Sequence, residues 1–218
     1  MTFAAPFIVL EGPEGAGKSY QAGALSAWLR SQGWQVVQTR EPGGTPAGDA
    51  IRSILLQSDH LHLEPETEAL LMTAARAQHV RELIVPSLHQ GIAVVCDRFV
   101  DSTYAYQGGG SQLGIEPLLP LQEFAVGHLQ PDVRLLLDIP VEIGLARRHG
   151  DVASVNRIDR APMAFHERVR AAFLDRVAAA PENWDVIDAT KSIDEVAESI
   201  ILAVARRIRA FVPPVSRS

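Results

Sequence analysis

The sequence has almost none of the residues that build disulfides or structural metal sites. Its 218 residues include one cysteine, Cys96, and a lone cysteine cannot form a disulfide within the chain. The seven histidines are scattered, and none stands near cysteine or carboxylates at the spacing of a zinc site. These absences exclude a disulfide scaffold, disfavour a structural zinc protein and favour a reducing, cytoplasmic location. Cys96 lies in an apolar pattern, which is typical of a buried small hydrophobe.

Long apolar runs and excess positive charge are also missing. No segment is long and apolar enough to cross a membrane. A net charge of −6 disfavours binding to nucleic acid through a broad positively charged surface. Lysine occurs only at Lys18 and Lys191, so almost all basic residues are arginine. Arginine binds phosphate with two parallel hydrogen bonds, which suits a phosphate-handling site, and GC-rich codon usage explains the same bias equally well.

The sequence is rich in short apolar runs that alternate with helical patterns. Strands are predicted at residues 7–10, 35–39, 92–96 and 133–139, and a fifth begins at 186 and reaches 190. Helices are predicted at 20–29, 49–56, 65–89 with a kink or break at Pro86, 116–129, 141–149, 165–178 and 194–211, the last capped by Ser192; another helical piece is broken by Gly108, Gly109 and Gly110. Continuously apolar strands separated by helices predict one α/β domain over 1–218, with a parallel sheet covered on both faces.

Residues 12–19, GPEGAGKS, carry the strongest chemical signal. They fit the phosphate-binding loop pattern G-x-x-x-x-G-K-[ST], and they stand between a predicted strand and a predicted helix, as that pattern requires. The glycines let successive backbone N–H groups point at an anion. Lys18 can reach the outer phosphates of a nucleotide, and Ser19 can give its hydroxyl to magnesium. The predicted ATP-binding residues are therefore Gly12, Pro13, Glu14, Gly15, Ala16, Gly17, Lys18 and Ser19.

Charged residues follow the carboxyl ends of other predicted strands, where ligands bind in parallel sheets. Arg40 follows the second strand, Asp97 and Arg98 follow the third, and Asp138 follows the fourth. A carboxylate at the position of Asp97 can hold magnesium, and Arg98 can bind an acceptor phosphate. Arg76, in the middle of a helical stretch, is a further candidate; the alternative is a structural arginine paired with a carboxylate.

Three stretches together resemble bacterial thymidylate kinases: LEGPEGAGKS at 10–19, TREPGGT at 39–45 and DRFVDSTYAYQGG at 97–109. The resemblance covers about residues 7–211. It implies a P-loop kinase fold, with a five-stranded parallel sheet, helices on both faces and a short arginine-bearing lid. It also implies transfer of the γ-phosphoryl group of ATP to dTMP, with Mg²⁺, to give dTDP and ADP in dTTP biosynthesis. A homodimer is implied as well.

The resemblance implies a role for each matching residue. Lys18 and Ser19 would serve ATP and magnesium, and Asp97 would support the magnesium ion. Glu14 would contact the sugar hydroxyl of dTMP, and Tyr106 would pack against the deoxyribose. The other acceptor-site residues would be the phosphate-binding arginines Arg40, Arg76 and Arg98, a further arginine of that pocket, Arg52, and the base-recognising residues Thr103 and Gln107.

The source of the catalytic arginine is a point on which family members differ. Some carry an arginine in the P-loop at the position of Gly15, so this chain resembles the class that supplies it from the lid, predicted over 150–162. Arg157 stands at that position, and Arg147 and Arg148 are nearby. The catalytic set implied is thus Lys18, Asp97, Arg98 and Arg157.

Two positions depart from the family pattern. Met72 replaces the aromatic residue that usually stacks on thymine; sulfur also packs on ring faces. Asn156 begins the lid pattern where aspartate is common.

Two other functions stay open on the sequence. One is a different P-loop kinase of nucleosides or nucleotides. The other is a P-loop GTPase, for which the matches are poor: Val100 stands where Asp-x-x-Gly needs glycine, and Asn156-Arg157-Ile158-Asp159 lies in the lid stretch. For the kinase, we expect direct in-line transfer without a general base, because the acceptor is already an anion.

Overall fold

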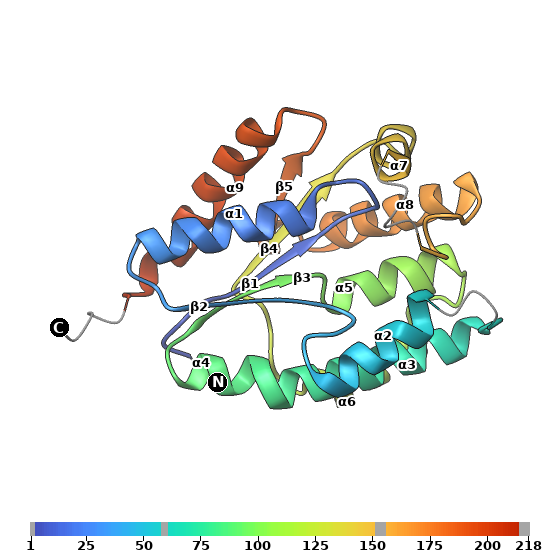
Figure 1. Ribbon diagram of the computed structural model, residues 1–218, viewed down its shortest axis with the longest axis horizontal. Coiled ribbons are helices and arrows are strands. Elements are labelled where there is room, and N and C mark those ends of the chain that lie inside the picture. The colour runs from blue at the N-terminus through green and yellow to red at the C-terminus, as the bar shows by residue number, and fades with distance from the viewer. Residues whose placement is uncertain (1–2, 58–60, 151–155, 214–218) are drawn as a thin grey trace.

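The computed structural model describes residues 3–57, 61–150 and 156–213, in which five parallel strands form one sheet (Figure 1). The strands are β1 (Phe7–Glu11), β2 (Val36–Arg40), β3 (Ala93–Asp97), β4 (Val133–Asp138) and β5 (Trp184–Asp188). Their order is β2-β3-β1-β4-β5. The central strand β1 aligns Leu10 with Asp97 of β3 and with Leu135 of β4. The carboxyl ends of β1, β3 and β4 therefore meet at one edge, as the sequence predicted.

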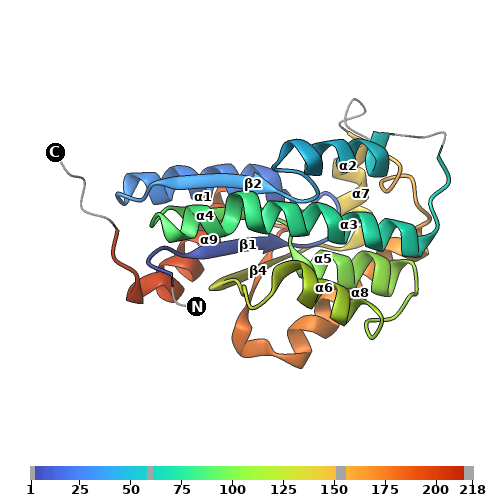
Figure 2. The ribbon, with the colours of Figure 1, turned by 90° about the horizontal axis from the view of Figure 1, so that it is seen from below.

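Helices cover both faces of the sheet (Figures 1 and 2). On one face lie α1 (Lys18–Ser31) and α9 (Ile193–Arg207), and on the other lie α3 (Pro65–His79), η1 (Val80–Ile84), α4 (Val85–His89), α6 (Leu118–Val126) and α8 (Met163–Ala179). The remaining helical segments are α2 (Pro46–Gln57), α5 (Val100–Thr103), η2 (Tyr104–Gly110), α7 (Val141–His149), η4 (Pro181–Asn183) and η5 (Ile208–Ala210). None of the helices in the described part of the chain is long and apolar enough to span a membrane.

Burial on both faces explains why the strands read as continuous apolar runs. Along β1, Ile8 and Leu10 pack into the core under α1 and α9, whereas Phe7 and Val9 pack into the core under α4 and α6. All four are buried. The inner strands β1, β3 and β4 are therefore almost entirely apolar, which is the pattern expected of a parallel sheet between two helical layers.

Element ends differ from the sequence prediction by a few residues. Strand β5 begins at Trp184, two residues before the predicted start, because the buried Trp184 pairs with Arg134 of β4. The predicted N-cap of α9 is confirmed: Ser192 accepts a hydrogen bond from the backbone N–H of Glu195, whose carboxylate accepts one from the Ser192 N–H. This reciprocal pair satisfies two backbone donors that a helix start leaves open.

The helix predicted over 65–89 does not break at Pro86. It continues from α3 through the π-helical turn η1 into α4, and the wide turn lies before the proline. Because proline has no N–H, it removes one hydrogen bond of the preceding turn, and a π turn changes the bonding pattern locally without ending the helix.

The predicted break at Gly108–Gly110 is also displaced, because all three glycines lie inside η2, which ends after Gly110. A Cβ atom on Gly109 would lie 2.6 Å from the Cβ of Ala172, and one on Gly110 would lie 2.6 Å from a ring carbon of Phe165. The glycines therefore allow close packing of η2 against α8. This contact matters for function because η2 carries Tyr106 and Gln107.

Candidate active site

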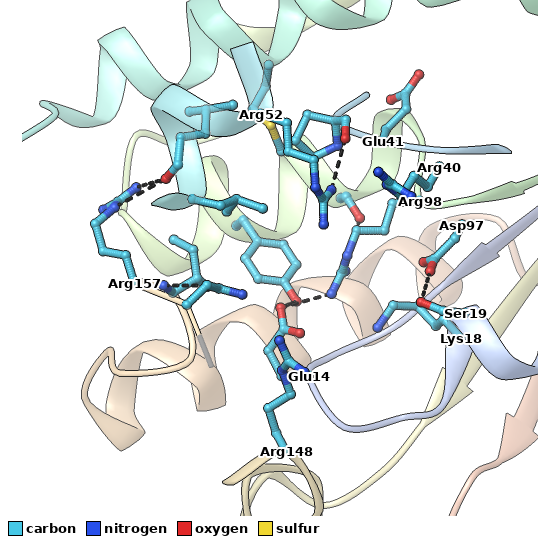
Figure 3. Close-up of a pocket in the computed structure, with 18 of the residues that line it drawn as sticks. Glu14, Lys18, Ser19, Arg40, Glu41, Arg52, Asp97, Arg98, Arg148 and Arg157 are labelled. Carbon is cyan, nitrogen blue, oxygen red and sulfur yellow. Dashed lines mark hydrogen bonds and ion pairs between the residues drawn. The ribbon is translucent and has the colours of Figure 1, made fainter. Parts of the chain in front are cut away.

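A cavity of about 400 Å³ opens at the carboxyl end of the sheet (Figure 3). Most of the predicted site residues line it: Glu14, Gly15, Gly17, Lys18, Ser19, Arg40, Arg52, Met72, Asp97, Arg98, Tyr106, Gln107 and Arg157. Five predicted residues lie outside its lining: Gly12, Pro13, Ala16, Arg76 and Thr103. Gly12, Pro13 and Ala16 belong to the P-loop beside the cavity. Arg76 and Thr103 are buried behind the cavity wall.

The P-loop holds its shape through glycines with positive φ. Gly15 has φ +71°, and a Cβ there would lie 1.9 Å from the carbonyl oxygen of Gly144 in α7. Gly144 is equally tight, since its own Cβ would lie 2.3 Å from the carbonyl oxygen of Glu14. The loop and α7 therefore touch backbone to backbone. No side chain fits at Gly15 in this arrangement, which agrees with the prediction that the loop supplies no arginine.

Lys18 closes the loop by donating a hydrogen bond from Nζ to the carbonyl oxygen of Pro13, at 2.7 Å. Burial, reinforced by the charge of Arg98, lowers the pKa of Lys18 to about 8. A nearby anion favours the charged form of a lysine, so an anion bound at the loop would stabilise the positive charge of Lys18. The geometry therefore prepares Lys18 for phosphate.

Ser19 and Asp97 meet where the P-loop helix faces the end of β3. The Ser19 hydroxyl donates to Asp97 Oδ2 at 2.5 Å (Figure 3). Asp97 Oδ1 is buried and has no hydrogen-bond partner among the described residues. Among these residues no cluster of three or more His, Cys, Asp or Glu side chains could hold a metal ion. Oxygen ligands of this kind, one hydroxyl and one carboxylate, fit a Mg²⁺ ion that takes its other ligands from phosphate and water.

Arg98 and Glu14 form a hydrogen-bonded pair in the cavity beside the P-loop. Arg98 donates to Glu14 Oε1 at 2.9 Å and to the carbonyl oxygen of Gly12 at 2.9 Å. The Tyr106 hydroxyl donates to the same Glu14 oxygen at 2.7 Å, and the Arg98 guanidinium lies 4.7 Å from the Tyr106 ring centre. Burial alone would raise the pKa of Glu14, but Arg98 and Lys18 outweigh it and lower the pKa to about 2. Glu14 is thus an ionised hydrogen-bond acceptor in the cavity.

Glu11 fixes the backbone that carries Arg98, a role that the sequence analysis missed. Arg98 has φ +73°, a conformation that side chains rarely adopt. Glu11 accepts hydrogen bonds from the backbone N–H groups of Phe99 (2.8 Å) and Ser102 (3.2 Å), and from the Ser102 hydroxyl (2.5 Å). Burial and the carboxylate of Asp101 raise the pKa of Glu11 to about 7. The available signal was a charged residue at the end of an otherwise apolar strand.

Arg40 and Arg52 come from the β2–α2 region and point toward the same cavity (Figure 3). Arg40 is 57% exposed and lies 3.8 Å from Asp49. Arg52 donates to the carbonyl oxygen of Pro42 at 2.9 Å. Both lie at the rim, where long side chains can turn toward an anion.

Arg76 is fully buried, which the sequence left as the structural alternative. Its guanidinium donates to Glu41 (2.7 Å), Thr103 (2.8 Å), Gln122 (2.5 Å) and the carbonyl oxygen of Phe99 (2.7 Å). With 1% exposure and bonds in these four directions, Arg76 lies away from the phosphate position at Arg98. A direct contact of Arg76 with the acceptor phosphate therefore has no support here, and Thr103, itself buried under Arg76, is placed in the same supporting layer.

Arg157 lies at the end of the cavity lined by Leu55 and Glu68 and not at the P-loop. It donates to Glu68 at 2.5 Å and, over 3.4 Å, to the carbonyl oxygen of Leu55 (Figure 3). Arg148 lies beneath Glu14 in Figure 3 and adds to the lowering of the Glu14 pKa. Of the predicted lid, residues 151–155 lie outside the described residues.

Glu68 was not predicted, although the sequence contained a signal for it. It precedes Met72 by four residues and Arg76 by eight, so all three lie on one face of α3. Glu68 and Met72 line the cavity. A carboxylate on a helix face with buried functional residues is the pattern that could have identified it.

A second cavity, of about 390 Å³, adjoins the first at the P-loop. The two share Gly15, Gly17, Tyr20 and Arg147. The second extends toward Lys191 and Ser192 at the start of α9. Two cavities that adjoin at one loop can hold two ligands with their reacting groups close together.

A P-loop between two cavities, with arginines on the acceptor side, defines a P-loop kinase of nucleoside monophosphates. The comparisons with known proteins agree. The family model "Thymidylate kinase" matches residues 10–200. The thymidylate kinase of Thermomicrobium roseum is 50% identical over 194 residues, which cover 89% of this chain and 91% of that protein. That of Pseudomonas fluorescens is 49% identical over 197 residues, covering 89% and 92%.

A solved structure gives the same result at the level of the fold. The crystal structure of thymidylate kinase from Ehrlichia chaffeensis matches with a TM-score of 0.73 and 31% identity, over 92% of this chain and 98% of that one. The chain belongs to the thymidylate kinase family. It is accordingly a transferase, and the predicted five-stranded parallel fold and thymidylate kinase function are confirmed.

Proposed function

We propose that the protein transfers the γ-phosphoryl group of ATP directly to the phosphate of dTMP, giving dTDP and ADP. The observation that carries this proposal is the junction of two cavities at the P-loop, with Lys18 and Arg98 both lining the first cavity. Both reacting phosphates would lie between these two cations. Catalysis then consists of positioning and charge neutralisation.

The donor phosphates would bind to the backbone N–H groups of residues 12–19. Lys18 would exchange its bond to the Pro13 carbonyl for one to the outer phosphates. The nucleoside of ATP would extend into the second cavity, along Arg147 and toward Ser192. Ser19 and Asp97 would hold Mg²⁺, as the unpartnered oxygen of Asp97 suggests. When bound, Mg²⁺ neutralises phosphate charge and orients the γ-phosphoryl group.

The acceptor would lie with its phosphate at Arg98 and its base near Met72. Arg40 and Arg52 are close enough to the cavity to add hydrogen bonds to the phosphate. Glu14 would accept a hydrogen bond from the sugar hydroxyl, beside Tyr106. Gln107 would bind the base edge, because its amide oxygen is buried and has no partner in the described residues. Arg76 and Thr103 would support this end from below.

We place the arginine that assists transfer at Arg148, in contrast to the sequence-based choice of Arg157. Arg148 lies at the end of α7 beneath Glu14, and it is oriented by a 3.0 Å bond to the buried Asp159. Arg157 would first have to leave Glu68. Arg148 is therefore better placed to follow the P-loop, which α7 touches through Gly144.

We also propose a homodimer that forms through α3 and α6. These helices pack side by side (Figure 2) and expose Leu70, Leu119 and Phe124, the last to 78%. A partner covering them would remove apolar area from water. The mass from light scattering should be that of two chains, and Phe124→Glu should shift it toward one.

We place the reaction in the cytoplasm, where the lone buried thiol of Cys96 stays reduced.

A coupled assay tests the reaction itself. ATP consumption is measured with dTMP, dUMP, UMP, dCMP and dGMP, each as the sole acceptor. We expect turnover that depends wholly on the added acceptor and is most efficient with dTMP. ATP hydrolysis without acceptor, or equal rates with all five, would contradict the proposal.

A further inference from the structure

The amide of Gln107 faces the cavity with only one of its two ends engaged. The residue is 3% exposed and lines the cavity. Its Nε2 atom donates to Glu68 Oε2 at 3.4 Å, and its Oε1 atom has no hydrogen-bond partner among the described residues. A buried carbonyl oxygen without a partner is costly unless a ligand supplies a donor.

Glu68 decides which end of the amide is left for the ligand. A carboxylate accepts hydrogen bonds and donates none. If the amide of Gln107 were turned over, its oxygen would face the Glu68 oxygens, and two acceptors would repel each other. The NH₂ group must therefore face Glu68, and the carbonyl oxygen must face away from it. This assignment follows from the chemistry of the partner and does not depend on how the two ends of the amide were placed.

Arg157 holds the Glu68 side chain in place. The two side chains form an ion pair at 2.5 Å, and the Glu68 side chain is only 8% exposed. The Arg157 guanidinium donates hydrogen bonds and accepts none, so its contact fixes the Glu68 side chain and leaves a carboxylate oxygen to accept from Gln107. The ion pair thus maintains the acceptor that orients Gln107.

We propose that Glu68 is a positioning residue that sets base preference through Gln107. By holding the amide NH₂, it presents a fixed hydrogen-bond acceptor to the base. This inference rests on the proposed function and adds a reason for its choice among the pyrimidine bases. Thymine and uracil carry an N–H donor at ring position 3 and match this acceptor. Cytosine carries a lone pair at position 3, so that two acceptors would face each other.

The test uses dUMP and dCMP, which differ only at position 4 and in the proton at position 3. Their comparison isolates this edge from the methyl group of thymine. Glu68→Gln replaces the carboxylate by an amide of the same shape, which can accept or donate. The amide of Gln107 can then take either orientation. We expect the ratio of kcat/KM for dUMP over dCMP to fall at least tenfold, with the kcat/KM for dCMP itself rising above that of the unaltered protein.

The rise for dCMP is informative because a merely damaged site cannot produce it. Glu66→Gln, on the same helix but exposed, is the matched control and should leave the ratio unchanged. Glu68→Asp is a second variant that keeps the charge and withdraws it by one methylene. It should also lower the ratio, and it serves where Glu68→Gln does not fold. Dissociation constants for both nucleotides, measured without ATP, should show the same change.

A double-mutant cycle shows whether Glu68 acts through Gln107. Gln107→Leu should itself lower the preference, and adding Glu68→Gln to it should change the ratio no further. The inference is overturned if Glu68→Gln and Glu68→Asp keep the ratio within twofold, or if Glu68→Gln lowers it equally in the Gln107→Leu background. The proposed function fails separately, if the unaltered protein does not phosphorylate dTMP.

Discussion

Arg148→Gln and Arg157→Gln, made in parallel, test which arginine assists the transfer. Both substitutions remove one positive charge and keep a polar side chain of similar reach. We expect Arg148→Gln to lower kcat strongly, because this residue lies beneath Glu14 beside the P-loop. Arg157→Gln should change kcat little, because this arginine pairs with Glu68 at the base end of the cavity.

The expected magnitudes differ by about two orders. An arginine that neutralises charge on the transferring group contributes about a thousandfold or more in rate, which equals about 4 kcal/mol of activation free energy. Loss of the Arg157–Glu68 pair removes one ion pair whose arginine is 30% exposed. Partly exposed pairs contribute about 1 kcal/mol or less, so the effect should stay below about tenfold and appear in dTMP binding.

Turnover at saturating ATP and dTMP, with the dissociation constant of dTMP measured by calorimetry, separates the two effects. Because Arg148 acts mainly in the transition state, its variant should bind dTMP almost normally. The reverse result, a thousandfold loss for Arg157→Gln and less than tenfold for Arg148→Gln, would restore the sequence-based choice. It would also mean that Arg157 leaves Glu68 during catalysis.

Four further variants and one change of pH test other parts of the site. Lys18→Ala should abolish turnover while circular dichroism stays unchanged, and near-normal activity would reject its role at the phosphates. Because the pKa of Lys18 is lowered to about 8, its charge is lost as pH rises through that value, so ATP affinity of the free protein should fall above pH 8; flat affinity to pH 9.5 contradicts this. Asp97→Asn should raise the Mg²⁺ concentration needed for half-maximal activity, whereas an unchanged Mg²⁺ titration would place the ion elsewhere. Gly144→Ala should weaken ATP binding and lower the free energy of unfolding by about 1–3 kcal/mol, since its Cβ would lie 2.3 Å from the Glu14 carbonyl oxygen. Arg76→Met should lower it by about 3–5 kcal/mol, because the buried Glu41 carboxylate loses its arginine partner and keeps only His79; a melting temperature equal to that of the unaltered protein would show that the buried network contributes little.

Local patterns were sufficient to predict the order of elements and most of the cavity. The P-loop, β3 with Asp97, and the residues of η2 are contiguous motifs. Continuously apolar strands indicate a parallel sheet, and a parallel sheet brings the carboxyl ends of its strands to one edge. The ends of elements were less predictable, because tertiary contacts decide them. Trp184 extends β5 by pairing with β4, and the glycines of η2 are needed for contact with α8 and not for a turn.

Side-chain partners were the part that the sequence could not supply. Arg76 and Arg98 are both arginines near functional motifs, yet one is buried against Glu41 and the other lies in the cavity. The difference depends on residues far away in the sequence, as with Arg76, whose partners lie 23 to 46 positions away. Arg157 was placed at the phosphates by the motif that contains it, but its position is set by Glu68 on α3.

The contact between the P-loop and α7 explains why a catalytic arginine cannot come from the P-loop itself and must come from another segment. At Gly15 a Cβ would lie 1.9 Å from the backbone of Gly144, and the backbone there has a positive φ. An arginine at this position would force the loop and α7 apart, so the loop cannot carry the charge itself while this contact exists. The same contact joins the loop to the helix whose last turn holds Arg147 and Arg148. If Arg148 assists the transfer as proposed, this backbone contact would keep its cation near the γ-phosphoryl group and would couple any movement of α7 to the P-loop.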